Sequence, residues 1–454
     1  MKGRLAELAR RYLPSGALIV SALFFGSYVV GLLRERVLAS TFGAGAELDA
    51  YNAAFQLPEL LFDVLVEAGL AAAFIPIFAR LRSTEDGIAD ADRFARSVLT
   101  LSIVIMGVGS VLLFIFAEGT TEIIAPGFTG AQRTLYLDLF RIMLVTQVLF
   151  AASLTLGQVL LADRRYFWYA LAPILYSTGI IVGTVALSDA IGIYAAAVGA
   201  VFGAILHLGS RLVGLRGSSF RIGFDWDLRT AQMGEFGRLT IPRLVSQPIE
   251  PITFAFFTNL ASRMAAGSLT VFNMARNFQS APVTFVGASF AVAAFPALST
   301  AYADDDRRAF VRLVGRNLVS IVALTLLASV AMVVLGEIAI GILLGGGAFD
   351  ADDVSRTAAV LSAFALSVPF ESASQLLSRA IFATRHTLFQ ALASIAGLLV
   401  AMAATLLLID RLELIALPIG FAIGQATKSV LLALVLGWRL RAWPATSPLE
   451  AWSG

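Results

Sequence analysis

Ionisable side chains recur inside two of the most apolar stretches of the sequence, YVVGLLRERVLASTF and NAAFQLPELLFDVLVEAGL. The residues concerned are Arg34, Glu35, Arg36, Glu59, Asp63 and Glu67. A charge at the centre of a bilayer costs at least ~2.5 kcal/mol, so such residues are usually paired or line a polar path. Arginine is suited to bind phosphate by charge-assisted hydrogen bonds, and carboxylates can compete for the same guanidinium groups. The pattern therefore indicates binding of an anionic group within the membrane.

The spacing of the polar residues places them on one face of a helix. They follow one another at intervals of three or four: Asn52, Gln56, Glu59, Asp63 and Glu67. A matching stripe recurs in the second half of the chain at Asn273, Asn277, Ser280 and Thr284, with Arg276 beside it. One interpretation is internal neutralisation of Arg34 and Arg36 by neighbouring carboxylates. The other is that Arg34 and Arg276 together hold an anionic headgroup.

Other kinds of chemistry have little support in the sequence. There is no cysteine, which excludes disulfides, thiolate metal sites and a cysteine nucleophile. The two histidines, His207 and His386, do not form a cluster in the sequence. We therefore expect no catalytic residues, no metal site and no cofactor, and we predict that the protein is not an enzyme. No nucleic-acid partner is expected.

Composition predicts an all-α polytopic membrane protein. The chain has 454 residues, of which 58% are hydrophobic and 14% charged, whereas soluble chains carry about 25% charged residues. Apolar runs long enough to cross a bilayer predict about twelve spans, at roughly 15–41, 51–79, 96–117, 136–162, 167–187, 191–213, 238–260, 267–300, 313–335, 355–382, 387–409 and 413–438.

Charge in the loops predicts the orientation of these spans. Most arginines between spans fall on one side if the N-terminus is cytoplasmic, and the exceptions are Arg133, Arg263, Arg356 and Arg411. The positive-inside rule then places both termini in the cytoplasm. The opening MKGRLAELARRYLPSG predicts an amphipathic helix on the cytoplasmic surface.

The two halves of the chain resemble each other at one constant offset of 221 residues. LDAYNAAF at Leu48 aligns with LTVFNMAR at Leu269, and Gly199 aligns with Gly420. Six spans in each half predict two six-helix lobes with the same orientation, related by a parallel internal repeat. We expect an N-lobe at 1–215, a cytoplasmic linker at 216–237 and a C-lobe at 238–454. Such a repeat is typical of alternating-access transporters.

Several motifs resemble the MviN family of lipid II flippases, within the multidrug/oligosaccharidyl-lipid/polysaccharide exporter superfamily. They are GLLRERVLASTFGAGAELDAYNAAFQLPELL, AAAFIPIF, APGF and RNFQSAPVTFVGASFAVAAFPALS. The resemblance implies a protein of the bacterial inner membrane that moves lipid II, a lipid-linked saccharide diphosphate, from the cytoplasmic to the outer leaflet. We expect it to be a monomer. Lipid II and membrane lipids would be its partners.

The resemblance also implies roles for individual residues. Arg34 matches a first-helix arginine, Glu35 its acidic neighbour, Asp49 the acid after FGAG, Glu67 the second-helix glutamate and Arg276 the eighth-helix arginine. Further candidates for cargo contact are Glu59, Asp63, Asn52, Asn277 and Arg36. The sequence departs from the family where Tyr28 replaces an arginine and where Phe62 and Asp63 replace an arginine pair, which predicts a less cationic cavity. We expect a twelve-helix core, whereas typical members have two more helices.

Three alternatives remain open at the level of sequence. The cargo could be another lipid-linked polysaccharide unit or a small molecule exported by the same superfamily. A membrane glycosyltransferase would need larger external loops than the roughly 5–20 residues predicted between spans. An envelope scaffold without transport would retain the repeat only for packing.

Overall fold

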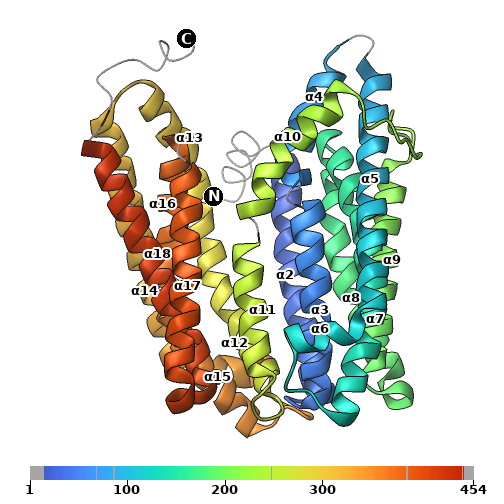
Figure 1. Cartoon of the computed structure of the whole chain (residues 1–454), viewed down its shortest axis with the longest axis vertical. Coiled ribbons are helices and arrows are strands. Elements are labelled where there is room, and N and C mark those ends of the chain that lie inside the picture. Colours follow the sequence, from blue (N-terminus) through green and yellow to red (C-terminus); the bar gives the residue numbers. More distant parts are fainter. Residues whose placement is uncertain are drawn as a thin grey trace, which may run out of the picture. The chain divides into compact units, whose positions relative to one another are not determined.

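The computed structural model describes residues 15–67, 69–84, 87–246, 248–384, 387–441 and 443, and this part of the chain is helical (Figure 1). The elements are α2(Ser15–Phe42), α3(Ala46–Phe62), η1(Asp63–Glu67), η2(Leu70–Phe74), α4(Ile75–Arg82), α5(Gly87–Ile115), α6(Ala117–Ile124), α7(Gly130–Ala162), α8(Tyr166–Ile191), α9(Tyr194–Leu215), α10(Ala231–Ser246), α11(Ile249–Ala261), α12(Ser268–Pro282), η3(Val283–Ala288), α13(Ser289–Ala303), α14(Arg307–Leu343), α15(Ala351–Ala365), α16(Val368–Ala383), α17(Thr387–Leu412), η4(Glu413–Ile415) and α18(Ala416–Arg441). Over the same residues, β pairing is limited to an isolated bridge between Gly346 and Phe349.

The all-helical membrane architecture predicted from composition is confirmed. Each predicted span overlaps a helix or a run of consecutive helices. By length and hydropathy, seven helices of the described chain could cross a membrane, or eight if α15 and α16, bent by 43° at their junction, form one span. The count of twelve spans stays a prediction, and the predicted N-terminal surface helix lies outside the described residues.

The helices form two compact units. Unit 1 comprises Met1–Gly267 with Leu343–Phe349, and unit 2 comprises Ser268–Ile342 with Asp350–Gly454. This division differs from the predicted boundary at residue 238, because α10 and α11 pack within unit 1: Gly69 lies against Thr240 of α10, and Gln56 of α3 accepts a hydrogen bond from Thr258 of α11 at 3.4 Å. The predicted seventh span, 238–260, is also divided between these two helices. The assignment of lobes therefore stays a prediction.

Close contacts between small residues hold neighbouring helices together in each unit. In unit 1, a Cβ added to Gly199 would lie 2.8 Å from the carbonyl oxygen of Gly179, so glycine lets α8 and α9 approach closely. In unit 2, a Cβ on Gly420 would lie 1.9 Å from Oγ1 of Thr405, where α18 packs on α17. Gly199 and Gly420 are separated by the 221-residue offset, so this contact recurs in both halves of the sequence.

The polar stripes coincide with local departures from α-helical geometry. The π-helical turn η1 covers Asp63–Glu67, and η3 covers Val283–Ala288. Since residue 63 corresponds to residue 284 at the repeat offset, both halves carry a π turn at nearly the same place. Such turns occur frequently at functional sites. This recurrence fits the predicted internal repeat.

Turns from both halves of the sequence also make equivalent contacts, all of them within unit 1. The amide of Gly127 donates to Oγ of Ser262 at 3.3 Å, and the amide of Ala348 donates to the carbonyl of Ser40 at 2.8 Å. Residue 127 corresponds to residue 348 at the offset, and residue 40 corresponds to residue 261. The two contacts are therefore repeat-related to within one residue.

Candidate functional site

Arg34 forms an ion pair with its neighbour on α2. Its Nη2 lies 2.5 Å from Oε1 of Glu35, with side-chain exposures of 27% and 18%. The charge of Arg34 also acts on Glu59 and on the phenol of Tyr51. The predicted neutralisation of Arg34 is therefore provided by Glu35. A guanidinium has five donors, so this partly exposed group retains donors for an anionic cargo.

The carboxylates of the stripe gather along α3 and η1. The side chains of Asp63 and Glu67 hydrogen-bond to each other, and Glu59 and Glu250 act electrostatically on Asp63. Glu59, Glu67 and Glu250 are exposed, whereas Asp63 is half-buried. This acidic group of unit 1 thus has three members from the predicted stripe and one from α11.

The π turn explains why Glu67 stays with the other acids. Eight residues of ideal α-helix would rotate Glu67 by about 80° from the face of Glu59. A π turn is wider and rotates less per residue, so η1 brings Glu67 back toward that face. The sequence spacing predicted the shared stripe, but the π turn that maintains it was not predicted.

Asp49 is buried at the start of α3 and holds a turn. Its side chain is 2% exposed, and Oδ2 accepts a hydrogen bond from the amide of Gly267 at 2.7 Å. Gly267 has a φ of +88°, and a Cβ there would lie 2.2 Å from the carbonyl oxygen of Ala44. This geometry favours a structural role for Asp49 over the cargo contact expected from sequence.

The remaining candidates of unit 1 lie at more accessible positions. Arg36 is exposed, and its Nη1 donates to the carbonyl of Leu343 at 3.2 Å. Asn52 is half-buried on α3.

In unit 2, Arg276 of α12 lies at the end of a polar chain. Its Nη1 donates to Oε1 of Gln279 at 3.1 Å, and its guanidinium lies 5.6 Å from the ring centroid of Phe421. Nε2 of Gln279 donates to Oε2 of Glu371 at 2.7 Å and to Oγ of Ser367 at 3.0 Å. Because the amide nitrogen of Gln279 donates to both Glu371 and Ser367, the amide oxygen is held toward Arg276. Asn277, also predicted, is exposed on the same helix.

Gln279→Leu should destabilise unit 2 and weaken function. Gln279 is fully buried and Glu371 is 6% exposed, so the leucine would remove an amide donor from Glu371 and release the contact that orients Arg276. The expected cost is about 1–3 kcal/mol in the free energy of unfolding. Thermal unfolding of the purified protein measures it, with Ser280→Ala as the matched control because that hydroxyl donates to the carbonyl of Asn277 in its own helix turn. Equal stability of the two variants would contradict the assignment.

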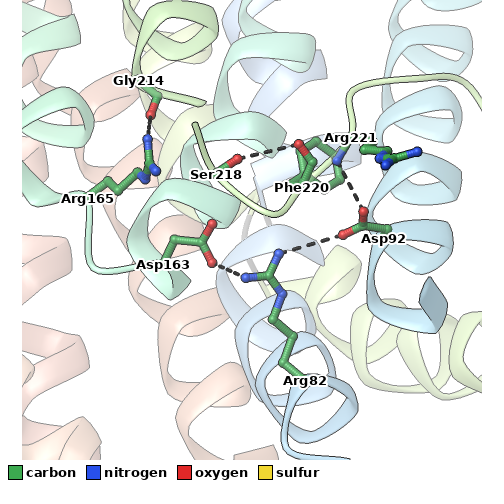
Figure 2. A network of polar contacts seen from close by, with 8 residues as sticks. All are labelled: Arg82, Asp92, Asp163, Arg165, Gly214, Ser218, Phe220 and Arg221. Atoms are coloured by element: carbon green, nitrogen blue, oxygen red, sulfur yellow. Dashed lines mark hydrogen bonds and ion pairs between the residues drawn. The ribbon is translucent and has the colours of Figure 1, made fainter. Parts of the chain in front are cut away.

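A second polar network lies where α4, α5, the α7–α8 turn and the end of α9 meet (Figure 2). Arg82 lies between two carboxylates: it bonds to Asp163, and its Nη2 is 3.6 Å from Oδ1 of Asp92. Arg165 donates to the carbonyls of Gly214 and Arg216, both at 2.7 Å. Burial raises the pKa of the Asp163 carboxyl, and Arg82 opposes that rise. The network joins helix ends that are distant in sequence.

Arg82→Met should lower the free energy of unfolding of unit 1 more at neutral pH than at acidic pH. It would leave two nearly buried carboxylates without their cation, at a cost of about 3 kcal/mol. Because the pKa of Asp163 is raised in the folded state, folding favours the protonated form of this carboxyl. Its contribution to the stability of the folded state is complete at a pH below the unfolded-state pKa and is lost as the pH rises through the folded-state pKa. The loss relative to wild type should thus be larger at about pH 7.5 than at about pH 5. Arg93→Met, at an exposed position of α5, is the control, and a pH-independent difference would contradict the prediction.

Comparison of the sequence with models of protein families shows the family of this chain. The family model described as "Lipid II flippase MurJ" matches residues 38–450. The chain belongs to the MurJ family. Because the match spans nearly the whole described structure, it includes the acidic stripe, Arg276 and the network around Arg82, and the family resemblance inferred from the motifs is confirmed.

Individual MurJ proteins are similar to the chain over most of their length. The "Lipid II flippase MurJ" of Burkholderia cenocepacia is 24% identical over 445 residues, covering 95% of this chain and 84% of the relative. The "Probable lipid II flippase MurJ" of Thermotoga maritima is 28% identical over 369 residues, covering 80% and 72%. That of Rickettsia prowazekii is 24% identical over 410 residues, covering 90% and 80%.

Solved structures support the fold alone, because their sequence identities are low. A lipid II flippase MurJ structure in an inward closed conformation matches with a TM-score of 0.79 at 23% identity, covering 92% of this chain and 87% of the other. An inward-facing multidrug resistance MATE family transporter matches with a TM-score of 0.79 at 15% identity, covering 96% and 100%. MurJ and MATE proteins therefore share this helical architecture.

Two buried residues beside Arg276 were missed by sequence reasoning. Gln279 and Glu371 were not candidates, although a glutamate within the apolar run SVPFESASQLL is the signal that could have indicated the latter. Among the described residues, no group of three or more His, Asp or Glu side chains is arranged to hold a metal ion. The site is thus built from ion pairs, amides and carboxyl groups.

Proposed function

We propose that the protein is a flippase that moves lipid II across the bacterial cytoplasmic membrane from the cytoplasmic to the outer leaflet. The observation that carries this proposal is the family match over residues 38–450. The cargo presents a diphosphate, and a partly exposed arginine on a membrane helix is the group suited to bind it. Alternating access between two lobes would carry the headgroup while the polyprenyl tail stays in lipid.

Arg34 and Arg276 are the proposed phosphate contacts, one in each unit. Arg34 is held by Glu35 and Arg276 by Gln279, so each guanidinium is oriented by a neighbouring side chain. That the two arginines face one central cavity stays a prediction. Glu67, Glu59 and Asp63 are proposed to compete with the cargo for Arg34, which would couple binding to lobe movement.

The proposed location is the bacterial inner membrane with both termini in the cytoplasm. The excess of arginine on one side of the predicted spans supports this orientation. The protein is proposed to act as a monomer and not as an enzyme, with lipid II and membrane lipids as its partners.

A second candidate function is export of small molecules, favoured by the equal TM-score to a MATE family multidrug transporter. The family model that matches the chain is described as "Lipid II flippase MurJ", which favours the flippase over the exporter. Another lipid-linked polysaccharide unit is the closest alternative as cargo.

Complementation tests the proposal in cells. Expression of the protein in a bacterial strain depleted of its own lipid II flippase should restore growth and cell shape. A strain deficient in a polysaccharide-unit flippase is the control and should not be rescued. Rescue of the second strain but not the first would reassign the cargo.

A further inference from the structure

An irregular segment, residues 220–227, begins in the network of Figure 2 and continues along α5. We call it the linker segment. Its Arg221 amide donates to Oδ2 of Asp92 at 3.1 Å, and its Asp225 amide donates to Oγ1 of Thr100 at 3.1 Å. Between them, a Cβ on Gly223 would lie 3.1 Å from Cδ of Arg96. The linker segment therefore lies along α5 for eight residues of that helix.

The linker segment is almost fully extended. Residues 92 to 100 of α5 cover about 12 Å at 1.5 Å per residue. The four residues from Arg221 to Asp225 must cover a similar length, and an extended chain reaches at most about 14 Å over four residues. In an extended chain, alternate side chains point to opposite sides.

Three apolar side chains alternate along this segment and face away from the protein. Ile222 is 51% exposed, Phe224 is 75% exposed and Trp226 is 56% exposed. Phe220, which precedes them, is buried in the core of unit 1 at 5%. The segment is thus fixed at its start and presents a row of large apolar groups outward.

The position of this row along α5 corresponds to the edge of the bilayer. Thr100 lies four residues inside the start of the predicted span 96–117, or about 6 Å, and each polar interfacial layer is about 5–7 Å thick. The next turns of α5 expose Val104, Val108 and Val111 at 40%, 56% and 58%, as expected for a surface in contact with lipid. The apolar row of the linker segment continues that surface at its cytoplasmic end.

The charges around the row complement an anionic membrane surface. Exposed arginines lie on and beside the linker segment, whereas two of the three nearby aspartates are half-buried. The arginines are Arg93, Arg216, Arg221 and Arg229, and the nearby aspartates are Asp90, Asp225 and Asp227. Aromatic residues with arginine at the headgroup level are typical of interfacial anchors.

We propose that the linker segment is a membrane-interface anchor, in which Ile222, Phe224 and Trp226 insert at the cytoplasmic headgroup boundary and the adjacent arginines bind phospholipid phosphates. The chain that connects the two repeats is therefore fixed to α5 and to lipid instead of running free in the cytoplasm. This inference does not depend on the cargo, so it holds whether or not the protein transports lipid II.

Spin labelling tests the anchor in the full-length protein. The chain contains no cysteine, so Phe224→Cys and the control Ser219→Cys each provide a single labelling site, and position 219 is an exposed part of the same linker. In nanodiscs of phosphatidylcholine with phosphatidylglycerol, the label at 224 should collide more with oxygen than with a water-soluble nickel chelate. The label at 219 should show the opposite preference, with a several-fold difference between their collision ratios.

Trp226→Cys gives a second site if the Phe224 variant does not fold. Replacing phosphatidylglycerol by phosphatidylcholine, or introducing Arg221→Gln with Arg229→Gln, should increase nickel access at position 224. Equal nickel access at 224 and 219 in all nanodiscs would overturn the proposal. Protection at 224 in native membranes but not in nanodiscs would also overturn it, in favour of a protein partner.

Discussion

Arg34→Ala should abolish rescue of a flippase-depleted strain while folded protein remains in the membrane. Arg34 lies on α2 beside Glu35 and retains donors that a diphosphate could use. Hydrogen bonds to charged groups contribute about 1.5–3 kcal/mol each, so loss of one contact should weaken binding of lipid II roughly 10- to 100-fold. Binding of labelled lipid II to the purified variant measures this loss directly.

Two matched variants distinguish cargo binding from structural pairing. Arg263→Ala removes an exposed arginine of the turn after α11, which is not a candidate for cargo contact, and should leave rescue largely intact. Glu35→Gln removes the ion pair but keeps the guanidinium, so it should reduce function less than Arg34→Ala. If Arg34→Ala and Glu35→Gln reduced rescue equally and lowered thermal stability by the same amount, Arg34 would be a structural residue.

Glu67→Gln should reduce transport more than Glu59→Gln at equal expression. Glu67 lies in η1, about 12 Å along the helix from Glu59 at 1.5 Å per residue, and it hydrogen-bonds Asp63. Neutralising it removes the negative charge that lies beside Asp63. Glu59, by contrast, interacts with Arg34 by charge alone.

The comparison is made with both variants in lipid vesicles, measuring the rate at which labelled lipid II appears in the opposite leaflet. Glu47→Gln is a suitable control, because it neutralises an exposed carboxyl group of the same helix that lies outside the stripe. Wild-type transfer rates for both glutamine variants would show that the carboxyl groups of the stripe have a structural role, and would contradict the proposed coupling of cargo binding to lobe movement.

Periodicity was sufficient to predict the helices and the polar stripe. Charged residues at intervals of three or four in an apolar run have few alternatives to a shared helical face, and Glu59, Asp63 and Glu67 do interact. The constant repeat offset likewise predicted related features, and the π turns at Asp63–Glu67 and Val283–Ala288 recur at nearly that offset.

Features that depend on tertiary contacts could not be predicted from spacing. Asp49 was expected near the cargo, yet it accepts a hydrogen bond from Gly267, which is distant in sequence. Gln279 and Glu371 meet only because α12 packs near α16. From the sequence alone, the linker segment is expected to be a polar cytoplasmic connection. The role of its apolar side chains can be inferred only from the path of the segment along α5.

This chain by itself is expected to move lipid II between leaflets. The most direct test reconstitutes the purified protein into vesicles that carry labelled lipid II in one leaflet, and follows its appearance in the other leaflet with and without a membrane potential. Transfer well above that of protein-free vesicles, abolished by Arg34→Ala, is the predicted result. Transfer at the protein-free rate under both conditions, from protein that is folded and inserted, would contradict the claim.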